Sequence, residues 1–250
     1  MRAGDELSLT IEKPAAGGRM LARHDGQVVL VAAAIPGEQV RARVSRVVKG
    51  VVFADAVAVD VPSPDRREPL CDWRCGGSVF AHIEPARQAQ LKAEIVDDAF
   101  RRIARAPLPA LPPVVPSPER GYRSRARLHV HGPRVGFLRE SSHELCDAAS
   151  TGQLAAATEA WILGASRTLA ARGLRGLRAI ELAEDVPGTQ RVCHLELAAG
   201  ESARSYQDLE NDLTGLTATV GEPEQAPEVS QLRGTGHLQE RLTVEVRGAR

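Results

Sequence analysis

Short runs of alternating apolar and polar residues fill the first part of the chain. Four runs stand out, over residues 7–11, 27–31, 39–44 and 51–57. Alternation with a period of two is typical of strands that have one buried face. Pairs that favour tight turns separate the runs: Gly17-Gly18, Asp25-Gly26 and Pro36-Gly37. Four to five strands in so short a segment predict a small closed β-barrel of the OB type.

The pattern then changes to a mixture of helix and strand periods. Apolar positions at helical spacing predict helices over 86–104, 154–171 and 202–213, with Leu91, Ile95 and Ile103 on one stripe of the first. Strands are predicted over 123–130, 135–139, 177–182, 191–197 and 241–246. We therefore predict a barrel over 1–62, a loop, helix and Pro-rich linker over 63–120, and an α+β domain over 121–250.

Composition indicates an ordinary globular protein. The 250 residues are 43% hydrophobic and 26% charged. The chain has no long apolar run, and charged residues at Arg2, Asp5 and Glu6 replace the pattern of a signal peptide. We expect a cytoplasmic protein with no membrane partner.

Charge is balanced overall but unevenly distributed. Between positions 101 and 140 there are nine arginines and two glutamates, whereas acidic residues dominate beyond Gly200. Arginine binds phosphate bidentately and stacks on bases, so this block favours RNA binding, although an ordinary arginine-rich surface would look similar. The candidates for RNA phosphates are Lys13, Arg19, Arg23, Arg41, Arg43, Lys49, Arg123, Arg125, Arg127 and Arg134.

Aromatic residues are scarce, at 3% of the chain. Phe53, Tyr122 and Phe137 are the few candidates for stacking on RNA bases. Core packing is the alternative for Phe53 and Phe137. Arginine side chains could stack on bases instead.

A cysteine loop is the candidate metal site. It runs Cys71-Asp-Trp-Arg-Cys75-Gly-Gly-Ser78, and Cys146 could add a third thiolate. Ser78 offers a hydroxyl, which soft metals bind poorly. Cys193 stands in a predicted strand with no base motif around it, so we expect a buried core cysteine there rather than a nucleophile.

Several motifs occur in an order that resembles a known family. They are Ile35-Pro-Gly-Glu-Gln-Val40, Ser63-Pro64-x-Arg66, Cys75-Gly-Gly-Ser78 followed by His82, Gln88 and Lys92, and Tyr122-Arg123 followed by Gly136-Phe137 and Cys146. Together they resemble the amino-terminal half of the bacterial uracil-5 RNA methyltransferases. The resemblance implies a TRAM domain, a central domain and a Rossmann-like catalytic domain that uses S-adenosylmethionine. In cluster-bearing members four cysteines hold a [4Fe-4S] cluster, and here Ser78 replaces one of them.

The resemblance also sets the expected function. We find neither the glycine-rich donor loop nor the Asp-Pro-Pro motif of the catalytic cysteine, so we expect the Rossmann-like domain to be absent and this chain to carry no cofactor. The chain would then be the RNA-recognition portion of an rRNA or tRNA methyltransferase. It would be truncated, inactive alone and completed by a separate catalytic domain or chain, which the stripe of the 86–104 helix would contact. The alternatives are a stand-alone TRAM-type RNA-binding protein and a small iron-sulfur or metal-binding protein.

Overall fold

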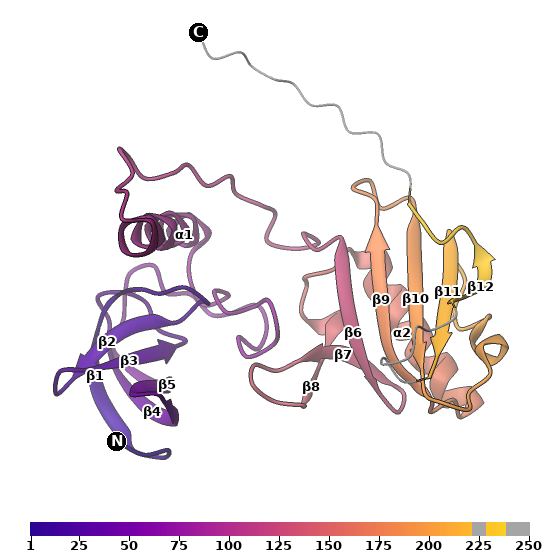
Figure 1. The fold of residues 1–250 in the computed structure, drawn as a ribbon, viewed down its shortest axis with the longest axis horizontal. Coiled ribbons are helices and arrows are strands. Elements are labelled where there is room, and N and C mark those ends of the chain that lie inside the picture. Colours follow the sequence, from indigo (N-terminus) through magenta and orange to yellow (C-terminus); the bar gives the residue numbers. More distant parts are fainter. Residues whose placement is uncertain (222–228, 239–250) are drawn as a thin grey trace, which may run out of the picture. The chain divides into compact units, whose positions relative to one another are not determined.

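The computed structural model describes residues 1–221 and 229–238 and divides into two compact units, Met1–Pro118 and Glu119–Arg250 (Figure 1). Each unit has its own sheet and its own core. The strand predicted over 241–246 lies outside the described residues. No helix in the described ranges is long and apolar enough to span a membrane.

A closed five-stranded barrel forms the body of the first unit. Its strands are β1 (Glu6–Pro14), β2 (Met20–His24), β3 (Gln27–Ala32), β4 (Gln39–Val48) and β5 (Val51–Val61), paired in the order β1-β2-β3-β5-β4. Side chains alternate between the core and the outer surface, as Leu7, Leu9 and Ile11 on β1 show. The parallel pairing of β3 with β5 and the antiparallel pairing of β4 with β1 close the barrel. Four of the five strands coincide with the alternating runs, and β2 was missed.

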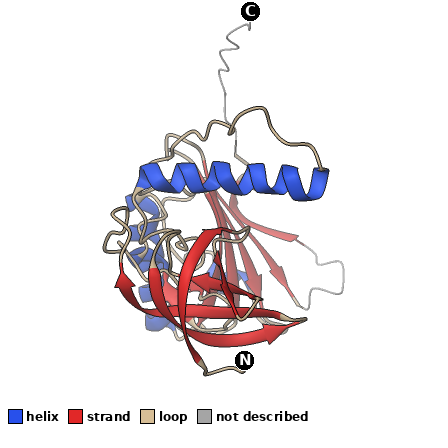
Figure 2. Ribbon diagram, turned by 90° about the vertical axis from the view of Figure 1, so that its left-hand side faces the viewer, coloured by secondary structure: helices blue, strands red, loops and turns tan. Residues whose placement is uncertain are grey.

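The segment after the barrel packs against it. Helix α1 (Pro85–Ala99) lies along one side of the barrel and continues into a π-helical turn, Phe100–Ala104 (Figure 2). Ile83 and Leu91 are fully buried in the barrel's hydrophobic core. The expectation that the stripe of this helix contacts a separate catalytic domain or chain is therefore wrong for Leu91. Ile103, at the end of the stripe, is 78% exposed.

A seven-stranded sheet forms the second unit. Its strands are β6 (Arg125–His131), β7 (Arg134–Leu138), β8 (Leu145–Asp147), β9 (Leu177–Glu184), β10 (Arg191–Leu197), β11 (Gly215–Val220) and β12 (Val229–Gly234), in the order β12-β11-β10-β9-β6-β7-β8. Neighbours are antiparallel except β10 and β11. Short 3-10 turns occupy Ala148–Ser150 and Ala203–Tyr206. The helix predicted over 202–213 is therefore wrong beyond one short turn.

Helix α2 (Ala156–Arg172) lies behind the sheet in the view of Figure 1 and ends at Gly173, whose φ of 64° gives a left-handed cap. Leu128, Ile180 and Leu195, from three neighbouring strands, are fully buried on one face of the sheet. The residues between them, such as Arg127 and Glu181, point to the opposite face and are exposed. The sheet thus has one covered face and one open face, and we call the latter the open face.

Candidate nucleic-acid interface

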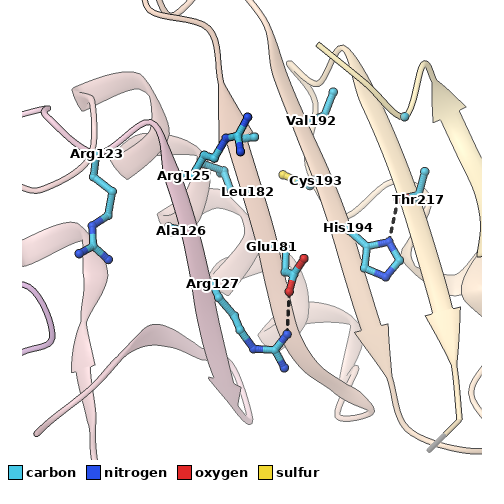
Figure 3. A pocket seen from close by; sticks show the side chains of 12 residues that line it. Arg123, Arg125, Ala126, Arg127, Glu181, Leu182, Val192, Cys193, His194 and Thr217 are labelled. Carbon is cyan, nitrogen blue, oxygen red and sulfur yellow. Dashed lines mark hydrogen bonds and ion pairs between the residues drawn. The ribbon is translucent and has the colours of Figure 1, made fainter. Parts of the chain in front are cut away.

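A row of polar side chains crosses the open face from strand to strand. Arg127 on β6 pairs with Glu181 on β9, Glu181 with His194 on β10, and His194 with Thr217 on β11. Above this row lies a cavity of about 440 Å³, shown in Figure 3. We call it the open-face pocket, and its lining comprises Arg123, Arg125, Ala126, Arg127, Glu181, Leu182, Ala183, Val192, Cys193, His194, Thr217 and Gly236.

Two carboxylates neutralise Arg127 at one side of this pocket. Its guanidinium donates to Glu181 Oε1 at 2.8 Å and to both carboxylate oxygens of Glu196, with Nη2 2.7 Å from Oε2. The hydrogen bond to Glu196 is the main cause that raises the pKa of Arg127. Because its donors are directed at carboxylates, Arg127 clamps three strands together and is poorly placed to bind a phosphate.

Arg125 is the contrasting residue. It is exposed and lines the pocket, and its side chain makes no hydrogen bond or ion pair within the described ranges. Arg123 also lines the pocket, and its guanidinium lies 5.1 Å from the ring centroid of the buried Phe137. Phe137 is thus a core residue that orients an arginine, and Arg125 and Arg123 keep donors for an anion.

A histidine forms the polar floor of the pocket. The Nδ1 and Nε2 atoms of His194 lie 2.8 Å from Thr217 Oγ1 and 3.1 Å from Thr219 Oγ1. Both ring nitrogens are therefore held by hydroxyl groups, which fixes the ring. Sequence reasoning missed these residues, as it missed Glu181. The alternation in 191–197 already places His194 on the face opposite Cys193, but only the strand order shows what lies beside it.

Most predicted cations of the barrel are already paired. Lys13 meets Asp98 at 2.7 Å, Arg23 meets Glu12 at 3.6 Å, Arg41 meets Asp60 at 3.3 Å and Arg43 meets Glu6 at 2.8 Å. Arg19 is only 11% exposed and donates to Ala54 O at 2.9 Å and to Asp55 at 3.2 Å, so it is a structural residue. Lys49 stands exposed in the β4–β5 turn, and Arg134 on β7 donates to Leu145 O at 3.3 Å. The sequence could not distinguish paired arginines from available ones.

The resemblance motifs of the first unit form a buried anchor. Glu38 is fully buried, and its carboxylate accepts from Arg66 Nε at 2.6 Å, Arg66 Nη2 at 2.7 Å, Ser63 N at 3.0 Å and Ile35 N at 2.8 Å. Burial acts to raise the pKa of Glu38, but the hydrogen bonds from Arg66 and Ser63 outweigh it and lower that pKa. His82 lies beside this anchor, 2% exposed, with Nε2 3.2 Å from Ala34 O. These motifs therefore connect the barrel to the segment that follows it.

The cysteine loop does not assemble a metal site in the described ranges. Cys71 Sγ and Ser78 Oγ are hydrogen-bonded at 3.2 Å, and Cys75 and Cys146 are both buried, with Cys146 Sγ 3.5 Å from Phe137 O. Cys71 and Cys193 are the free cysteines of the described residues, whereas Cys75 and Cys146 are disulfide-bonded. Within the described residues there is no group of three or more His, Cys, Asp or Glu side chains placed to hold a metal ion. Cys193 is 3% exposed, and burial raises the pKa of its thiol to about 12, so it is an inert core residue, as predicted.

Comparison with known proteins decides the nature of the barrel. Residues 2–57 match the TRAM domain. Over 205 residues the chain is 34% identical to the 23S rRNA (uracil(1939)-C(5))-methyltransferase of Thiobacillus denitrificans, a match that covers 79% of this chain and 43% of that protein. It is 35% identical over 147 residues to an RNA methyltransferase of Bdellovibrio bacteriovorus, covering 58% of this chain and 37% of the relative. The chain is thus similar in sequence to RNA methyltransferases, one of them a uracil-C5 enzyme, and spans 43% and 37% of the length of these two relatives.

A solved structure extends the comparison to the fold. The tRNA (uracil-54, C5)-methyltransferase of Pyrococcus abyssi, solved in complex with S-adenosyl-L-homocysteine, superposes with a TM-score of 0.61 at 20% sequence identity. The superposition covers 93% of this chain and 57% of that one. The prediction that a Rossmann-like domain is absent is therefore wrong. The chain aligns over 93% of its length with such an enzyme and has a second, seven-stranded sheet, so a Rossmann-like domain is not excluded. Neither the predicted truncation nor the predicted inactivity of the chain is shown by these comparisons.

Two glycines of the second unit pack strands together rather than form a turn between a strand and a helix. S-adenosylmethionine enzymes of this type need a glycine-rich turn between a strand and a helix. In the described ranges Gly215 and Gly234 lie opposite each other on β11 and β12, where a Cβ would meet the backbone carbonyl of Thr235 or of Thr214, next to the partner strand. These glycines allow the two strands to pack closely, and no step through S-adenosylmethionine is placed on them.

Proposed function

We propose that this chain binds ribosomal or transfer RNA for methylation at C5 of uracil, with S-adenosylmethionine as the methyl donor. The activity and donor rest on the homologous methyltransferases, and RNA recognition rests on the TRAM barrel and the open face of the second unit. The open-face pocket with its available Arg125 is the observation that carries RNA binding. It combines a cation that lacks a partner in the described ranges with the polar His194 and Thr217.

The contrast between Arg125 and Arg127 supports this role. A phosphate group binds best to an arginine whose guanidinium N–H groups have no other acceptor, and those of Arg127 already donate to Glu181 and Glu196. Arg123 is held by the ring of Phe137 and needs little reordering to bind. We therefore assign phosphate contacts on this face to Arg125 and Arg123, and a positioning role to Arg127.

Salt-dependent RNA binding by the full chain tests the proposal. Fluorescence anisotropy with labelled tRNA and with a transcribed 23S rRNA stem-loop should show affinity that falls as sodium chloride rises. Loss of one phosphate contact in Arg125→Gln should weaken binding to both RNAs and reduce the salt slope by about 1. Arg167→Gln is the matched control, because Arg167 is an exposed arginine of α2, which covers the other face of the sheet.

Methyl transfer tests the second half of the proposal. The full chain incubated with the same RNAs and radiolabelled S-adenosylmethionine should label uracil at C5. RNA binding without any transfer would favour the stand-alone RNA-binding module, and equal affinities of Arg125→Gln and Arg167→Gln would remove the pocket from RNA recognition.

A further inference from the structure

One aromatic side chain stands on the outside of the barrel with arginines around it. Phe53 on β5 alternates with Val52 and Ala54, which are fully buried, so its ring points outward and is half-buried. The guanidinium carbon of Arg46 lies over this ring, 4.4 Å from the centroid, and that of Arg19 lies 5.6 Å from it. Phe53 is thus not a core residue, and its ring carries a cation on the surface.

A β-bulge in β4 creates this arrangement. Val44 pairs with Ala54 and Arg46 with Phe53, so Ser45 is an extra residue between two successive pairs. Its hydroxyl donates to Phe53 O at 3.1 Å and fixes the bulge. Without the bulge, alternation would place Ser45 outward beside Phe53; with it, Arg46 takes that place. The sequence pattern alone therefore could not pair Arg46 with Phe53.

Arg46 differs from the other arginines of this strand. Arg41 and Arg43 are paired with Asp60 and Glu6, whereas the side chain of Arg46 is exposed and makes no hydrogen bond or ion pair in the described ranges. Arg19 is fixed beneath by Ala54 O and Asp55. The positive charge of Arg46 is therefore available, and the ring of Phe53 orients its guanidinium.

We infer that Arg46 stacked on Phe53 is a platform for an unpaired RNA base. A guanidinium plane accepts a base on its outer face while its N–H edge donates to a phosphate. Stacking is tolerant of base identity, but it requires a base that is not enclosed in a helix. The inference rests on the proposed function and adds that the barrel selects a single-stranded segment of the RNA, separately from the open-face pocket.

Two substitutions of the full chain test the platform. Phe53→Leu should weaken binding of a short labelled oligouridine about 5- to 150-fold, the range expected for loss of one stacked base, and leave binding of a blunt RNA duplex unchanged. Arg46→Gln should weaken oligouridine binding and reduce its salt slope by about 0.7. Phe53→Trp should keep the affinity, because a larger ring can still orient Arg46.

Matched controls separate stacking from general effects. Phe100→Leu removes another half-exposed phenylalanine of the same unit, and Arg101→Gln removes an exposed arginine that pairs with Asp97. Both should bind oligouridine like the unmodified chain. Where Phe53→Leu fails to fold by circular dichroism, Arg46→Gln and Phe53→Trp decide the question.

The failures of the two proposals are distinguishable. If tRNA still binds but Phe53→Leu and Arg46→Gln match their controls with oligouridine, the platform is refuted and the proposed function stands. Equal losses on oligouridine and on the duplex would also refute it, because they would indicate a plain phosphate contact. If the unmodified chain binds neither tRNA nor oligouridine, both proposals fail.

Discussion

The buried anchor gives the sharpest stability prediction. Glu38→Gln keeps the size of the side chain but replaces one carboxylate oxygen by an amide that donates. Of the four donors that now converge on the carboxylate, from Arg66, Ser63 and Ile35, those facing the new amide lose their acceptor. We expect the first unit to be strongly destabilised.

The loss in free energy of unfolding expected for Glu38→Gln follows from the burial of the ion pair. Breaking a buried ion pair by removing one partner costs about 3–5 kcal/mol. Glu38 is fully buried but the side chain of Arg66 is 23% exposed and can recover some hydration, so the lower end, about 3 kcal/mol, applies. Because the pKa of Glu38 is lowered below its ordinary value of 4.5, this contribution is fully present above pH 4.5. It is lost as the pH falls through the lowered pKa.

Hydrogen exchange read by mass spectrometry is the assay, because it reports the two units separately. Peptides from the barrel of Glu38→Gln should exchange about a hundredfold faster, which corresponds to about 3 kcal/mol, and peptides from the second unit should not change. Glu6→Gln is the control: it makes the same substitution in the exposed pair with Arg43, for which less than about 1 kcal/mol is expected. Equal exchange in the two variants would refute the reasoning.

Three further outcomes are expected. Burial lowers the pKa of His82 from 6.5, so the unfolded chain binds a proton that the folded chain does not. The urea concentration at the unfolding midpoint should therefore decrease as the pH is lowered below 6.5, and it should decrease less steeply in His82→Gln. Cys193 should resist iodoacetamide at pH 8 until urea unfolds the chain, as mass spectrometry would show; rapid modification of the folded protein would contradict its burial. Gly136→Ala should destabilise the second unit by about 1–3 kcal/mol in urea titrations, because a Cβ there would collide with the carbonyl of Cys146, and an unchanged midpoint would show that the strands can separate.

Local sequence patterns predicted the strands that bury one face and expose the other. The alternation of Val40, Ala42 and Val44 against Arg41 and Arg43 gave β4, because one face of that strand is in the barrel core. Strand β2 was missed because it has only five residues between two turns. The helix predicted over 202–213 is limited to the turn Ala203–Tyr206, and near its predicted end Asp212 has a φ of 64°, which a right-handed helix cannot contain.

Candidate site residues were predicted by type but not by role. Residue type identified Arg125 and Arg127 equally as candidates, yet Glu181 and Glu196 bind the guanidinium of Arg127 and leave that of Arg125 available. Those partners are distant in sequence and meet only through strand order. A missing donor motif likewise does not decide whether a Rossmann-like domain is present, because such a domain is defined by pairing between strands that are distant in sequence.

The anchor at Glu38 also bears on where this barrel ends as a folding unit. The TRAM match stops at residue 57, but the buried carboxylate is satisfied by Ser63 and Arg66, and the core is completed by Ile83 and Leu91. A fragment cut at the end of the match would retain a buried charge without its counter-ion and a core open on one side. The barrel therefore depends on residues beyond the TRAM match, and we expect a stable fragment of it to extend through Leu91 in the following helix.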